Sequence, residues 1–129
     1  MQTLIDLVEK SAATFGNRPA LVIHAGLRDD VWTYDRLWGG INSVARYLRE
    51  EQGCAPGDRV LAWGPNCPQL AACYLGAMLA QVTLVPIDPI STPDFVGRIA
   101  EQTKAKTIFV GASMPLPPEP TQLNIRDMP

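Results

Sequence analysis

Residues 59–110 read RVLAWGPNCPQLAACYLGAMLAQVTLVPIDPISTPDFVGRIAEQTKAKTIFV, and short apolar runs alternate in them with helical patterns. The runs Arg59–Trp63, Val82–Ile87 and Thr107–Val110 predict buried strands. Helical patterns follow the first two runs, and each begins near a proline, Pro68 or Pro93, at a first helical position. Because the strands are continuously apolar, this order predicts a parallel sheet with helices on both faces.

The residues before this stretch predict a helix and a hairpin. Thr3 caps a helix that ends at Gly16, with Asp6 completing a capping box. The β-prone segments Ala20–His24 and Val31–Thr33 flank a turn-rich segment, residues 26–30, and predict an antiparallel hairpin. The expected fold is therefore three-layer α/β, with a mainly parallel sheet and an antiparallel hairpin near the N-terminus.

Cap residues predict where the other helices begin. Thr33 caps a long amphipathic helix that ends at Gly53, and Asn66 caps a helix over 68–80 that is apolar nearly all round. Thr92 caps the last helix. The predicted inner stripe of that helix is Phe95, Val96, Ile99 and Thr103.

The chain divides by composition near residue 111. Residues 1–111 carry the α/β pattern, whereas residues 112–129 form a proline-rich stretch that predicts a linker or a ragged end with little regular structure. The prolines of this stretch are Pro115, Pro117, Pro118, Pro120 and Pro129.

Charge and hydropathy exclude two classes of partner. The net charge is -2, and the 11 basic residues are scattered along the chain, so no nucleic-acid partner is expected. No apolar run reaches the ~18 residues of a membrane span, and residues 1–6 lack the features of a signal peptide, so a cytoplasmic protein is expected.

The cysteine and histidine residues of this chain do not predict a metal-binding, disulfide or catalytic site. Cys54, Cys67 and Cys73 lack the spacing of a zinc site or a disulfide framework, and they are expected to be reduced, buried thiols. His24 lies in an apolar run and is expected to be structural.

The motifs of nucleotide binding and nucleophilic catalysis are also missing. The sequence contains neither GxGxxG, GxxxxGK[ST] nor GxSxG, and its glycine pair, Gly39–Gly40, falls inside the long predicted helix. The adjacent acidic pairs Asp29–Asp30 and Glu50–Glu51 are expected to be solvated. No catalytic, cofactor-binding or metal-binding residue is therefore expected in this chain.

Four strings nevertheless resemble the amino-terminal region of the adenylate-forming (AMP-binding) superfamily, which contains acyl-CoA synthetases, peptide-synthetase adenylation domains and luciferases. They are WTYDRL (residues 32–37), GDRV (57–60), PNCP (65–68) and LAQVTLVPID (79–88). The family usually has glycine at the position of Gln81. Restoring that glycine could relax the turn or merely add entropy to the unfolded state.

Each string also has a structural interpretation, which is the favoured one. Thr33 and Asn66 are expected to cap helices, Tyr34 to pack against a first turn, Gly57 and Asp58 to shape a turn, and Pro86 to end a strand.

The resemblance implies that a complete enzyme would use ATP and Mg²⁺ to convert a carboxylate to an acyl-adenylate and then transfer the acyl group to CoA. The resemblance also implies that the phosphate loop, the ribose-binding aspartate and the lysine of the small mobile domain lie downstream, so this chain alone is expected to be inert. DPISTPDF (residues 88–95) looks closest to fatty-acid-CoA ligases, with other carboxylic acids as the alternative.

A second class of function stays open, namely a stand-alone, non-catalytic α/β binding or assembly module. In either case the isolated chain is expected to self-associate, most simply as a dimer, because the apolar helix over 68–80 has few other elements to cover it.

Overall fold

The computed structural model describes residues 3–111 and 122–124. The elements follow in the order α1 (Leu4–Phe15), β1 (Pro19–Ala25), β2 (Arg28–Thr33), α2 (Tyr34–Arg46), a π-helical turn η1 (Tyr47–Glu51), β3 (Arg59–Trp63), α3 (Pro68–Leu79), β4 (Thr83–Ile87), α4 (Pro93–Thr103), β5 (Ile108–Val110) and β6 (Gln122–Asn124).

The main sheet is parallel, as predicted. Its strand order is β4-β3-β5-β6, and β3 pairs in parallel with β4 on one side and β5 on the other. Leu61 of the central strand lies opposite Val85 and Ile108, so aliphatic side chains stand side by side across the sheet. This pairing agrees with the continuously apolar strands of the sequence.

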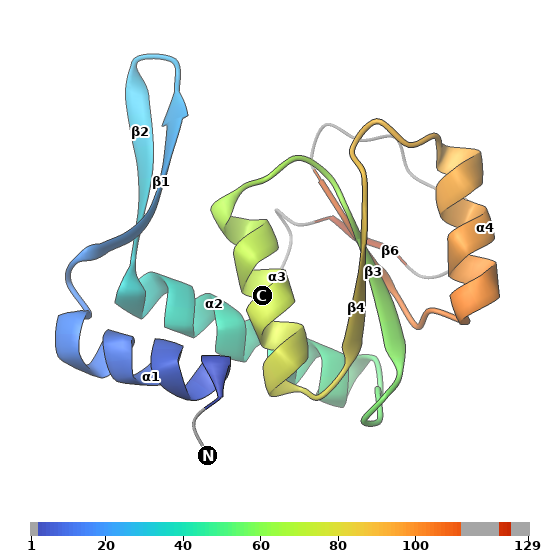
Figure 1. Ribbon diagram of the computed structural model, residues 1–129, viewed down its shortest axis with the longest axis horizontal. Helices are drawn as coiled ribbons and strands as arrows, with labels where there is room; N and C mark the ends of the chain where they lie inside the picture. The colour runs from blue at the N-terminus through green and yellow to red at the C-terminus, as the bar shows by residue number, and fades with distance from the viewer. Residues whose placement is uncertain (1–2, 112–121, 125–129) are drawn as a thin grey trace.

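Helices cover both faces of this sheet, which confirms the three-layer prediction. Side chains alternate along β3: Val60 and Ala62 pack with α2 and α3, whereas Leu61 and Trp63 pack with α4. Figure 1 shows α3 and α4 on opposite sides of β3. Phe109 joins the first cluster and is fully buried.

The predicted antiparallel hairpin is a separate two-stranded sheet of β1 and β2. It extends away from the other elements in Figure 1. Its turn consists of Gly26 and Leu27 and is shorter than predicted, because Gly26 adopts a φ of 65° that allows the chain to reverse within two residues. His24, expected inside an apolar run, is exposed and contacts Asp29 through Nδ1 at 2.6 Å.

Three of the four predicted caps are confirmed. The Thr33 hydroxyl accepts a hydrogen bond from the backbone N–H of Arg36 at 3.1 Å, and the Thr92 hydroxyl accepts one from Phe95 at 3.2 Å. The Thr3 capping box with Asp6 is also formed. These bonds satisfy helical N–H groups that have no partner within the helix.

Three predictions about single elements are wrong. Cys67, not Asn66, occupies the N-cap position of α3, and no side chain caps that helix. Phe95 does not belong to the inner stripe of α4, because it is 40% exposed while Val96 and Ala100 are buried. Strand β6 lies in the stretch expected to lack regular structure and pairs with β5. The division of the chain at residue 111 stays a prediction.

Gln81 occupies the turn from α3 to β4 in a left-handed conformation with φ of 61°. Its N–H donates to the Met78 carbonyl at 3.1 Å, and its own carbonyl accepts from Gly57 at 2.9 Å. This position after a helix normally favours glycine, because a side chain there meets the backbone.

We therefore expect Gln81→Gly to stabilise the fold by about 0.5 kcal/mol, since relief of ~1–2 kcal/mol of left-handed strain outweighs the added unfolded-state entropy. Gln81→Val should destabilise it by about 1 kcal/mol, because a β-branched residue tolerates this conformation poorly. Urea denaturation of the three proteins measures both values. Equal stability of the glycine and valine variants would contradict the assignment of strain at this turn.

Candidate functional site

The carboxyl ends of the parallel strands form one edge of the sheet. Trp63 lies opposite Ile87 on one side and Val110 on the other, so β3, β4 and β5 end in register. Ligands of open α/β sheets bind at this edge, outside the strand ends. The edge is therefore the first place to look for a site in this chain.

Asp88 begins the loop that follows β4 at this edge. Its carboxylate accepts a hydrogen bond from the Ile90 N–H at 3.0 Å, and its carbonyl accepts from the Ser91 N–H at 3.0 Å. The indole Nε1–H of Trp63 also donates to this carbonyl at 3.1 Å. The contacts of Asp88 thus close a tight turn and attach it to the sheet.

The first two residues of the second string, GDRV, form the turn before β3, and its last two begin the strand. The Asp58 carboxylate accepts from the Ala55 N–H at 2.9 Å, and the Asp58 carbonyl accepts from Thr83 at 2.8 Å. Gly57 has a φ of 87°, which a residue without a side chain adopts readily. Gly57 and Asp58 thus shape a turn, as the structural interpretation predicted, and the structure shows in addition that this turn is joined to the start of β4.

The other string residues have separate positions. Tyr34 is half-buried at the start of α2, and its backbone N–H donates a hydrogen bond to the Arg18 carbonyl at 3.1 Å. Asn66 is exposed beside α3, and Pro86 is exposed within β4 rather than at its end. Backbone hydrogen bonds of Gly57 with Gln81 and of Asp58 with Thr83 join the second string to the fourth.

Two of the cysteines are buried as expected, and one is not. Cys54 and Cys73 are buried, whereas Cys67 is partly exposed. Burial, and to a smaller extent the nearby Cys67, raises the pKa of the Cys73 thiol far above its ordinary value. Cys73 is therefore a thiol, not a reactive thiolate, at neutral pH.

Within residues 3–111 and 122–124, no group of three or more His, Cys, Asp or Glu side chains is placed to hold a metal ion. No helix in this described part is long and apolar enough to cross a membrane. The expectation that the chain carries no catalytic, cofactor-binding or metal-binding residue stays a prediction.

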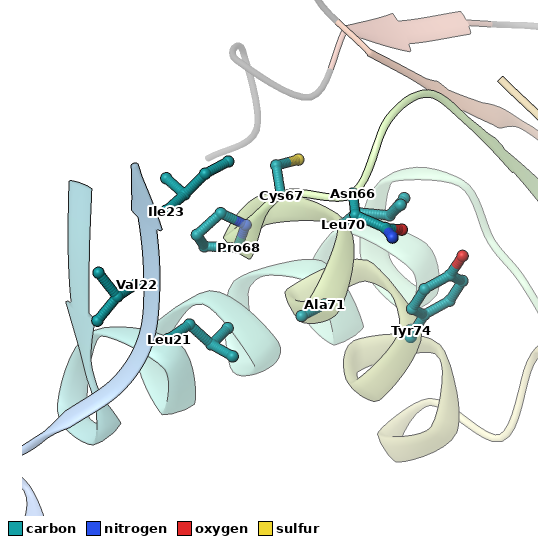
Figure 2. A pocket seen from close by; sticks show the side chains of 9 residues that line it. All are labelled: Leu21, Val22, Ile23, Asn66, Cys67, Pro68, Leu70, Ala71 and Tyr74. Carbon is teal, nitrogen blue, oxygen red and sulfur yellow. The ribbon is translucent and has the colours of Figure 1, made fainter. Parts of the chain in front are cut away.

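An apolar groove lies between β1 and the beginning of α3. It has a volume of about 370 Å³. Figure 2 shows Leu21 and Ile23 directed from β1 toward α3, where Pro68 and Ala71 lie. The full lining is Leu21, Val22, Ile23, Asn66, Cys67, Pro68, Leu70, Ala71 and Tyr74. The lining contains no charged side chain, which is typical of surfaces that accept apolar groups.

A second, smaller groove of about 190 Å³ continues along α3 toward β4. Its lining is Tyr74, Ala77, Met78, Val82, Leu84 and Pro86. Tyr74 borders both grooves. Analysis of the sequence did not identify either groove, although the all-round apolarity of α3 was the available signal.

Comparison with known proteins agrees with the four strings. The chain matches the family described as AMP-binding enzyme over residues 8–127. The chain belongs to the AMP-binding enzyme family. The adenylate-forming resemblance and the partial α/β fold are thereby confirmed.

Relatives within this family differ in the acids that their names specify. The chain is 33% identical over 92 residues to a long-chain-fatty-acid–CoA ligase of Escherichia coli O6:H1. This alignment covers 71% of the chain and 16% of that ligase. It is 28% identical over 126 residues to a D-alanine–D-alanyl carrier protein ligase of Bacillus mycoides, covering 96% of the chain and 24% of that protein. The chain thus spans less than a quarter of the length of either AMP-binding relative.

Solved structures share the fold. A fatty acyl-adenylate ligase from L. pneumophila, in complex with acyl adenylate and pyrophosphate, superposes with a TM-score of 0.87 at 24% identity, over 100% of this chain and 24% of that one. The N-terminal subdomain of Klebsiella oxytoca NpsA superposes with a TM-score of 0.78 at 19% identity, over 99% of this chain and 32% of that one. At these identities, the two likenesses show a shared fold.

Proposed function

We propose that this chain is the amino-terminal part of an ATP-dependent acid–thiol ligase, which forms an acyl-adenylate and then a thioester. The observation that carries the proposal is the family match over residues 8–127, combined with a chain that spans only 16% of the E. coli relative. The complete enzyme would use ATP, Mg²⁺ and CoA.

The chain's own residues would contribute a scaffold in this proposal. Thr33 and Thr92 cap the N-termini of α2 and α4, and the Trp63–Asp88 hydrogen bond attaches a loop to the carboxyl edge of the sheet. Stabilising a phosphoryl-transfer transition state requires preorganised donors aimed at the reacting phosphate. We propose that these donors come from the remainder of the enzyme, so that the chain alone is inert.

A long-chain fatty acid is the substrate class that we propose. The 33% identity to the E. coli ligase and the likeness of residues 88–95 to fatty-acid-CoA ligases support it. A D-alanine-type acid is the second candidate, because the carrier protein ligase of B. mycoides aligns with 96% of the chain.

The test is acid-dependent exchange of pyrophosphate into ATP, measured with the complete polypeptide. We expect exchange with palmitate to exceed exchange with D-alanine by at least tenfold, and the 129-residue chain to give no signal above a no-protein control. Exchange with D-alanine alone would replace the fatty acid in the proposal. Exchange by the 129-residue chain would show that it carries catalytic groups itself.

A further inference from the structure

We draw no further inference here: the strongest candidate, the uncharged apolar groove of about 370 Å³ between β1 and the beginning of α3, carries none, because nothing in the described part of the chain shows what covers it.

Discussion

Trp63→Ala is expected to lower the free energy of unfolding by about 3–5 kcal/mol, because the substitution empties a large volume in the core. Trp63 is fully buried between the sheet and α4, in a cluster with Val96 and Ile108. Its indole also holds the loop after β4 through the hydrogen bond to the Asp88 carbonyl. A loss of this size is a large fraction of the stability of a small domain. Chemical denaturation followed by circular dichroism measures it.

The control is Trp63→Phe, which keeps an aromatic ring but removes the N–H donor. We expect it to cost about 1–2 kcal/mol, mainly through the lost hydrogen bond, since the Asp88 carbonyl still accepts from Ser91. If alanine and phenylalanine were equally destabilising, the hydrogen bond and not the packing would dominate at this position.

Gly76→Ala is expected to destabilise the protein by about 1–3 kcal/mol through overpacking between α2 and α3. A Cβ atom at position 76 would lie 2.5 Å from the Cβ of Val44 and 2.9 Å from the carbonyl oxygen of Ile41. Because one of these contacts is with backbone, a side-chain rotation cannot relieve it, and the helices must separate. The expected loss opposes the ~1 kcal/mol that alanine normally contributes within a helix.

Gly39→Ala is the matched control for Gly76→Ala. Gly39 lies within α2 and is exposed, and a Cβ atom there meets nothing within 4 Å. The same substitution should therefore stabilise the protein by about 0.5–1 kcal/mol. A Cβ atom at Gly40 would lie 3.3 Å from side-chain atoms of Ala72 and Trp32. The change in unfolding free energy for Gly40→Ala should therefore lie between those for Gly39→Ala and Gly76→Ala. Equal effects at Gly39 and Gly76 in urea denaturation would contradict the close helix contact.

The local elements were largely predictable because short-range hydrogen bonds and periodicity specify them. Thr33 and Thr92 cap the helices that the sequence predicts, because a hydroxyl three residues before a helical N–H can accept from it without help from distant residues. Asn66 satisfies the same local preference, yet Cys67 occupies the N-cap position of α3, and no side chain caps that helix. A cap residue therefore predicts that a helix begins but does not alone determine the residue at which it begins.

For the candidate site, the sequence predicted the family and not the open surface. The strings that resemble the adenylate-forming superfamily lie in helix starts, turns and strands, which local patterns of the sequence predict. The side of α3 that borders the two grooves, in contrast, could not be separated from the buried faces of the same helix. Ala71 and Ala72 are adjacent and identical, yet only Ala72 is fully buried.

By itself, the sequence determined the order of helices and strands from α1 to β5, the parallel sheet and the family, because each depends on local patterning and on strings of adjacent residues. Only the tertiary structure decided which faces of α3 are covered, that Gly76 is a point of close contact with α2, and that Gln81 adopts a left-handed conformation. These features depend on residues far apart in the chain, such as Val44 beside Gly76 and Gly57 beside Gln81. Contacts of this kind arise only when the helices and strands pack, so no local pattern encodes them.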